Sequence, residues 1–192
     1  MRLPIILAST SRFRQELLSR IQLPFEAVAP ICDETPNPQE NAEQTALRLA
    51  ENKARSLSQQ FPNALIIGSD QVLWCNEKQY GKPMSLDKAH MMLRELSGKT
   101  LTFYTALVLL NTAENRIHRH VDKTLVHMRS LSDDMITYYL QEEPDAIYCA
   151  GSAKSEGLGM ILIERISSDD PNALIGLPML RLIDFFMAEG VL

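Results

Sequence analysis

The chain has 192 residues, 45% of them hydrophobic, which is enough for one domain with a substantial buried core. We therefore expect a single domain over residues 1–192. The formal net charge of −5 argues against general binding to nucleic acid or to a membrane surface, so an anionic ligand must be held by local features. The three cysteines form no CxxC pair and indicate neither a disulfide framework nor a zinc site. We expect a soluble cytoplasmic protein without signal peptide or membrane span.

The first part of the sequence alternates predicted strands and helices. An apolar run at residues 3–8 predicts a strand, hydroxyl residues follow at once, and an amphipathic helix comes next with Leu17, Leu18 and Ile21. The next expected elements are a strand at 25–29, a loop at 30–38 in which Pro36 and Pro38 block pairing, and a helix at 42–59 behind an Asn41–Gln44 capping box. An apolar strand at 64–75 is interrupted by Ser69, Asp70 and Gln71.

The remainder continues the alternation. In chain order the residues predict a turn at 81–83, a helix from the Ser85 cap to Leu96, a hairpin of strands 100–110 and 117–127, a helix at 132–141, a polar glycine-containing segment at 151–159, a strand at 160–166 and a helix at 180–188. Interleaved strands and helices indicate an α/β domain with a mixed sheet.

One phosphate-binding motif is excluded. Ser97-Gly98-Lys99-Thr100 resembles the end of a P-loop, but Leu93 stands where that motif needs its first glycine. The residues after it also favour a strand, whereas a P-loop leads into a helix.

The hydroxyl turn at Ser9 to Ser11 is a better phosphate site. Hydroxyls and free backbone N–H groups meet there at a helix N-terminus, which favours anions. Arg12 and Arg14 add cationic donors. The alternative is that the serines only cap the helix and the arginines are solvated.

Asp70 interrupts an apolar run, where a carboxylate is costly unless it binds a metal, a partner or a proton. A structural ion pair would explain it equally well. Glu34 is a second candidate carboxylate. Lys53 and Lys82 are candidate triphosphate clamps, with ordinary solvated lysines as the alternative.

These candidates occur within a series of blocks that resembles the Maf-like nucleoside triphosphate pyrophosphatases and spans nearly the whole chain. The blocks are Leu7-Ala8-Ser9-Thr10-Ser11-Arg12-Phe13-Arg14, Asp33-Glu34, Glu51-Asn52-Lys53-Ala54, Gly68-Ser69-Asp70-Gln71-Val72, Gly81-Lys82-Pro83, Ser97-Gly98 with Tyr104-Thr105, and Gly176-Leu177-Pro178.

The resemblance implies a fold related to the inosine triphosphate pyrophosphatases: an elongated mixed sheet flanked by helices, with two lobes and a nucleotide cleft. It implies hydrolysis of a nucleoside triphosphate to the monophosphate and pyrophosphate with a divalent cation, expected to be magnesium, manganese or cobalt. The aspartate matching Asp70 is then the general base. Further implied roles are phosphate binding at the positions matching Ser9, Arg14, Lys53 and Lys82, and metal binding at those matching Glu34 and Asp70.

Two departures from the commoner motif, Arg12 for proline and Phe13 for arginine, accompany a resemblance to the subgroup that acts on 7-methyl-GTP. Gln71 and the segment Gly151-Ser152-Ala153-Lys154-Ser155-Glu156-Gly157 resemble the same subgroup, whereas Ala106 departs from its usual glycine. Phe13 could stack on the cationic base, Glu156 could accept from guanine N1 and N2, and Gln71 could offer its amide. The alternative places Phe13 in the core, Glu156 on a loop surface and Gln71 as a strand cap.

Other interpretations stay open beside this one. The substrate could be dTTP, UTP or another modified nucleotide, or the chain could be a nucleotide-binding regulator of division without turnover. His118 and His120 share one face of a predicted strand and could bind a metal, although we favour a solvated hairpin. The apolar stripe of the last helix is core or subunit-contact material, which leaves a homodimer possible.

Overall fold

The structure, a computed structural model, describes residues 3–35 and 37–192, so the predicted role of Pro36 lies outside the described residues. The chain forms two compact units. The first unit comprises the residues up to Gln71 together with 105–122 and 170–192, and the second comprises 72–104 and 123–169. The single domain expected from the sequence stays a prediction.

The elements in chain order are β1 (Ile5–Ala8), α1 (Arg12–Ser19), β2 (Phe25–Val28), α2 (Ala42–Ser56), β3 (Leu65–Cys75), β4 (Lys78–Tyr80), α3 (Leu86–Leu96), β5 (Thr100–Asn111), β6 (Arg116–Met128), α4 (Asp133–Glu142), three short 3₁₀ turns, β7 (Ile163–Ser167) and α5 (Met179–Ala188). In the described residues the strands form one seven-stranded sheet in the order β2-β1-β3-β5-β6-β7, with β4 beside β3. β1 is parallel to β2 and β3, whereas β4 and β7 are antiparallel to their partners. The predicted α/β class with a mixed sheet is confirmed.

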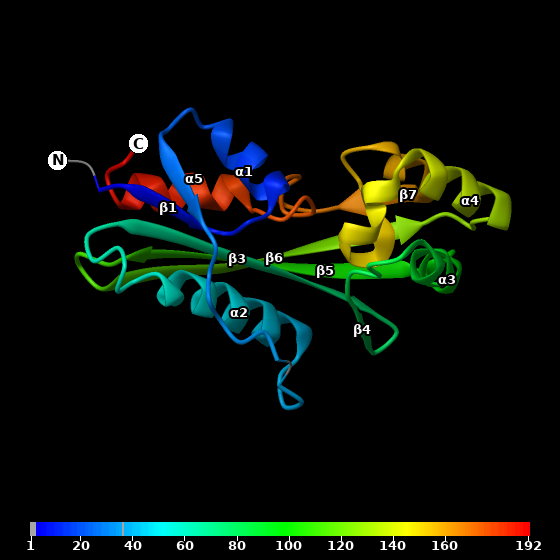
Figure 1. Ribbon diagram of the computed structural model, residues 1–192, viewed down its shortest axis with the longest axis horizontal. Helices are drawn as coiled ribbons and strands as arrows, with labels where there is room; N and C mark the ends of the chain where they lie inside the picture. The colour runs from blue at the N-terminus through cyan, green and yellow to red at the C-terminus, as the bar shows by residue number, and fades with distance from the viewer. Residues whose placement is uncertain (1–2, 36) are drawn as a thin grey trace. The chain divides into compact units, whose positions relative to one another are not determined.

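In the first unit, helices cover both faces of the sheet. Figure 1 shows α1 and α5 on one side of the strands and α2 on the other. Because successive strand residues point to opposite faces, Leu7, Ile67 and Leu109 share the face that packs with Leu182 and Phe186 of α5. This cluster of buried side chains is the core of the unit.

On the opposite face of the sheet, the backbone of α2 packs unusually close to the backbone of β3. A Cβ on Gly68 of β3 would lie 2.1 Å from the backbone oxygen of Ala50 and 2.9 Å from the backbone nitrogen of Ala54, both in α2. Ala46, Ala50 and Ala54 are fully buried, so the helix presents a stripe of small side chains here. Glycine is therefore required at this contact, which brings the middle of α2 against β3.

The order β2-β1-β3 creates a switch point in the connections. The chain leaves β1 through α1 on one face to reach β2, and returns through α2 on the other face to reach β3. In open α/β sheets, ligands bind outside the carboxyl ends of the strands where the connections diverge in this way. The residues after β1 and after β2 are therefore placed where a ligand is expected.

The second unit contains α3, α4 and the 3₁₀ turns packed around the remaining parts of the strands. Tyr139 of α4 is fully buried, donates to the oxygen of Ser152 at 2.9 Å and accepts from the nitrogen of Lys154 at 3.0 Å. Glu143 accepts from Lys154 Nζ at 2.7 Å and from the Leu158 nitrogen at 3.2 Å. These contacts hold the glycine-containing segment predicted at 151–159.

Element boundaries depart from the predictions at a few places. The strand predicted at 160–166 begins only at Ile163, because Leu158–Leu162 forms a 3₁₀ turn and pairing with β6 starts at Ile163 opposite Met128. The helix predicted to Gln59 ends at Ser56. The short strand β4 and the 3₁₀ turn Pro144–Tyr148 had no clear sequence signal.

Helix starts, by contrast, follow their predicted caps. Asn41 and Gln44 form the complete capping box, and Ser85 accepts from the backbone nitrogen of Lys88. Ser132, predicted as the first helical residue, is instead the N-cap of α4. None of the helices in the described ranges is long and apolar enough to cross a membrane.

Gly68→Ala should destabilise the protein by about 1–3 kcal/mol, because the added methyl overpacks a contact between backbones. Urea unfolding followed by circular dichroism measures this loss. Gly81→Ala is the matched control, since a Cβ there meets no atom within 4 Å, and it should stay within about 0.5 kcal/mol of wild type. Equal stability of the two variants would contradict the tight contact.

Candidate functional site

The turn after β1 carries the predicted phosphate-binding residues. Ser9 is buried, and its Oγ accepts from the nitrogen of Ser11 at 3.1 Å. Ser11 is the N-cap of α1, which is the structural role that the alternative interpretation gave to these serines. Arg14 lies one turn into the helix with Nη1 3.5 Å from Ser9 Oγ and Nε donating to the oxygen of Gly176 at 2.8 Å. The guanidinium is therefore held over the turn instead of being solvated.

Asp70 pairs with Lys53 across the contact that Gly68 permits. Lys53 Nζ donates to Asp70 Oδ1 at 2.5 Å and lies 2.8 Å from Glu34 Oε1, which comes from the loop after β2. The side chains of Lys53 and Asp70 are 10% and 13% exposed, whereas that of Glu34 is 60% exposed. The structure thus brings two predicted carboxylates, Glu34 and Asp70, to the ammonium group of the predicted phosphate ligand Lys53.

The charges of this cluster act on one another. Burial alone would lower the pKa of Lys53, but the charge of Asp70 and the hydrogen bonds to Asp70 and Glu34 outweigh it and raise the pKa. Burial lowers the pKa of Arg14, opposed by Asp70 and Glu34. Both cations keep their charge at neutral pH, because a guanidinium does not deprotonate in proteins and Lys53 is shifted further toward its charged form.

The two carboxylates fit a divalent cation. Asp70 and Glu34 reach the same nitrogen, so their oxygens converge, and carboxylate oxygens are the ligands that Mg²⁺ prefers. Groups of three or more His, Cys, Asp or Glu that could hold a metal are absent from the described part of the chain. A pair suffices for Mg²⁺, which is commonly held by one or two carboxylates together with substrate phosphates.

Gln71 lies on the other face of the sheet. It follows Asp70 in β3, so its side chain points away from α2 toward the segment before α5. Its Nε2 donates to Thr105 Oγ1 at 2.9 Å and to the oxygens of Ala173 and Leu174 at 3.1 and 3.0 Å. The amide nitrogen of Gln71 therefore already donates its hydrogen bonds to protein acceptors. The amide oxygen is the atom through which Gln71 could contact a base.

Phe13 is half-buried, so it is not the core residue of the alternative interpretation. The guanidinium carbon of Arg12 lies 4.9 Å from the centre of its ring. One face of the ring therefore already carries a cation, and a stacked base would use the other.

Lys82 and Glu156 belong to the second unit, and both are exposed. Lys82 lies in the loop between β4 and α3. Glu156 lies within the turn of Lys154 to Gly159, whose nitrogens at Gly157 and Gly159 donate to the oxygen of Lys154 at 3.0 and 3.1 Å. Their roles in phosphate binding and base selection stay predictions.

Two hydroxyl residues that the sequence reasoning gave no role take part in the arrangement. Ser69 donates to the oxygen of Gly176 at 2.9 Å, and Thr105 donates to the oxygen of Ala173 at 2.9 Å. Both side chains are fully buried. The signal that could have found them is a hydroxyl inside an otherwise apolar strand, because a buried hydroxyl needs a partner.

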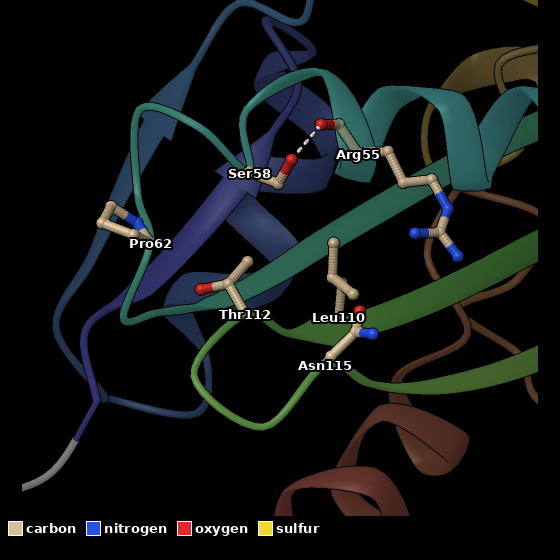
Figure 2. A pocket seen from close by; sticks show the side chains of 6 residues that line it. All are labelled: Arg55, Ser58, Pro62, Leu110, Thr112 and Asn115. Carbon is tan, nitrogen blue, oxygen red and sulfur yellow. Dashed lines mark hydrogen bonds between the residues drawn. The ribbon is translucent and has the colours of Figure 1, made fainter.

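A small pocket of the first unit lies apart from these residues. Its volume is about 190 Å³, and it is lined by residues at the end of α2 and around the β5–β6 turn, namely Arg55, Ser58, Pro62, Leu110, Thr112 and Asn115 (Figure 2). Sites for small molecules commonly enclose roughly 300–1,000 Å³, and none of the predicted site residues lines this one. We assign it no catalytic role.

His118 has a structural partner. Its Nε2 lies 2.7 Å from Oε1 of Glu189, and its ring stacks on Phe185 with centroids 5.0 Å apart. Hydrogen bonding to Arg116 lowers the pKa of Glu189 to about 2, against burial, which raises it. His118 thus joins β6 to the C-terminal helix, so it is not the solvated side chain that we favoured from the sequence.

Lys53→Met should lower the free energy of unfolding by about 1–3 kcal/mol, because it leaves the partly buried Asp70 carboxylate without its donor. Lys82→Met, which removes the same charge from an exposed lysine, should change stability by no more than about 0.5 kcal/mol. Urea unfolding of both variants measures the difference. Equal stabilities would show that the Lys53 pair contributes nothing to folding.

Comparison with known proteins shows the family to which the chain belongs. The profile of the family described as Maf-like protein matches residues 4–189. A protein of Neisseria gonorrhoeae named 7-methyl-GTP pyrophosphatase is 58% identical over 98% of this chain and 96% of its own length. Proteins of the same name from Chromobacterium violaceum and Aliivibrio fischeri are 54% and 48% identical over 97% of this chain, and over 97% and 96% of their own lengths. The chain therefore belongs to the Maf-like protein family.

Proposed function

We propose that this protein hydrolyses 7-methyl-GTP between its α and β phosphates, releasing 7-methyl-GMP and pyrophosphate. The observation that carries the reaction is the group of Asp70, Lys53, Glu34 and Arg14, in which Arg14 and Glu34 lie in the segments that follow the parallel strands β1 and β2. The substrate follows from the names of relatives that match nearly the full chain.

The cations offset the charge of the triphosphate. Arg14 and the backbone at the start of α1 meet the phosphates, and the helix N-terminus adds its own preference for anions. Lys53 and Lys82 stabilise the negative charge that grows on the leaving pyrophosphate. An acidic protein can therefore bind a polyanion through local charge alone.

Asp70 acts on the attacking water. One water adds its oxygen to the α phosphorus, the bond from this phosphorus to the bridging oxygen breaks, and that oxygen leaves with the pyrophosphate. Asp70 orients the water and receives its proton, as a general base within hydrogen-bond reach does. Lys53 fixes the carboxylate in place at 2.5 Å.

We also propose that Glu34 and Asp70 hold a divalent cation, either magnesium, manganese or cobalt. Such a cation would supply positive charge to the phosphate oxygens as the bond breaks. Their convergence on one nitrogen supports this assignment.

For base selection we propose Phe13, Gln71 and Glu156. The free face of the Phe13 ring attracts the positive charge of 7-methylguanine. The Gln71 amide oxygen and the Glu156 carboxylate accept from guanine N–H groups, since a carboxylate only accepts when ionised.

Asp70→Asn should lower kcat by about 10²–10⁴-fold, because it keeps the shape of the side chain but removes the oxygen that takes the proton. Pyrophosphate release measures turnover, and calorimetric titration with 7-methyl-GTP should show binding largely retained. The matched control is Asp33→Asn, since Asp33 is an exposed carboxylate that bonds to Thr35 in the same loop as Glu34.

The control should retain wild-type kinetics. Activity of Asp70→Asn within about tenfold of wild type would remove Asp70 from the central role. Nucleotide binding without any turnover by the wild-type protein would favour the regulator over the enzyme.

Wild type should have a higher kcat/KM for 7-methyl-GTP than for GTP, dTTP or UTP. Phe13→Arg and Glu156→Gln should each reduce the preference over GTP by about 2- to 30-fold, which corresponds to the usual strength of cation–π and charge contacts. Steady-state kinetics with each nucleotide measure the ratios.

Glu142→Gln is the control for Glu156→Gln, because it removes the same charge from an exposed position in the second unit. It should leave the preference unchanged. Turnover of dTTP by wild type that equals or exceeds that of 7-methyl-GTP would overturn the substrate assignment and leave pyrophosphatase activity standing.

A further inference from the structure

The backbone oxygen of Gly176 accepts two hydrogen bonds, one from a strand and one from a helix. Ser69 Oγ donates to it at 2.9 Å from β3, and Arg14 Nε donates to it at 2.8 Å from α1. Ser69 is fully buried and directly precedes Asp70 in the strand. One carbonyl group thus links the strand of the candidate base to the arginine of the phosphate turn.

The segment that carries this carbonyl is itself held by side chains. Gln71 and Thr105 bond to the oxygens of Ala173 and Leu174. Asp170 accepts from the Leu180 nitrogen at the start of α5 at 2.6 Å. These bonds fix the segment on both sides of Gly176, and the Ser69 hydroxyl bonds to the Gly176 oxygen between them.

Glycine at position 176 is a requirement of this arrangement. Its φ is +125°, a conformation that other residues rarely adopt, and a Cβ there would lie 3.4 Å from Arg14 Nε. The backbone conformation, and not a lack of space beside Arg14, therefore requires glycine here.

We propose that Ser69 is a positioning residue that fixes the Arg14 guanidinium through the Gly176 oxygen. A guanidinium is planar, so a bond at Nε sets the direction of its two terminal nitrogens. One of these, Nη1, already lies 3.5 Å from Ser9 Oγ at the phosphate turn. This role rests on the proposed function of Arg14 as a phosphate ligand.

Holding the arginine in advance favours binding because a free arginine loses considerable rotamer freedom when it is fixed by a ligand. Without the Ser69 hydroxyl, the Gly176 oxygen loses one of its two donors and the guanidinium gains freedom. The consequence is weaker binding of the pyrophosphate moiety with little change in the water-activating step.

The test compares Ser69→Ala and Arg14→Met, alone and combined, by calorimetric binding of pyrophosphate with Mg²⁺ and by kinetics with 7-methyl-GTP. Ser69→Ala should weaken pyrophosphate binding and raise KM by about 3- to 10-fold, with kcat within about twofold. In the Arg14→Met background the same substitution should have less than about a twofold effect, since it acts through that arginine.

Thr112→Val is the matched control, because it removes another hydroxyl that bonds to a backbone oxygen in the first unit, that of Phe61 at 2.7 Å. It should leave pyrophosphate binding unchanged even where stability falls. An equal effect of Ser69→Ala with and without Arg14, or wild-type binding by Ser69→Ala, overturns the proposal. Absence of hydrolysis by a wild type that binds pyrophosphate would instead overturn the proposed function, and the binding cycle would still decide the role of Ser69.

Discussion

The contact between α2 and β3 at Gly68 is the constraint on which the site depends. Only a residue without a Cβ allows the backbones of Ala50 and Ala54 to come so close to the strand. At this distance Lys53, one residue before Ala54, reaches Asp70, two residues after Gly68. A wider helix–strand separation would leave Asp70 partly buried without a donor, which is costly. The glycine thus determines both the packing and the charge pair.

Successive side chains of β3 then point to opposite faces of the sheet and have different partners. Asp70 points toward α2, where Lys53 and Glu34 surround it. Ser69 and Gln71 point to the opposite face, where they bond to the segment before α5. Arg14 interacts with both faces, because it donates a hydrogen bond to Gly176, and the charges of Asp70 and Glu34 oppose the lowering of its pKa by burial. Neighbouring residues of one strand therefore have different surroundings, with Asp70 in the charge cluster at α2 and Ser69 and Gln71 bonded to the segment before α5.

Local charge balance explains how a protein of net charge −5 can hold a triphosphate. The carboxylates of Asp70 and Glu34 keep Lys53 charged although burial opposes it. The same carboxylates support the charge of Arg14. If these cations bind the phosphates as proposed, they need little reorganisation, which is the advantage of a preorganised site. A substrate that brings a divalent cation would in turn meet the two carboxylates.

Local periodicity and capping predicted the α/β class, most of the helices and strands, and the caps at Asn41 and Ser85, and the resemblance suggested the residues of the candidate site. The sequence could not place those residues in space. That Lys53 pairs with Asp70 depends on a helix–strand distance set by Gly68, and that Gln71 turns away depends on the face on which Asp70 is buried. The strand predicted from Met160 started late for a similar reason, since pairing with β6 and not hydrophobicity decides where β7 begins. Ser69 bonds to Gly176, which is 107 residues away in the chain. Such long-range hydrogen bonds leave no periodic signal in a sequence, so only the tertiary structure decided them.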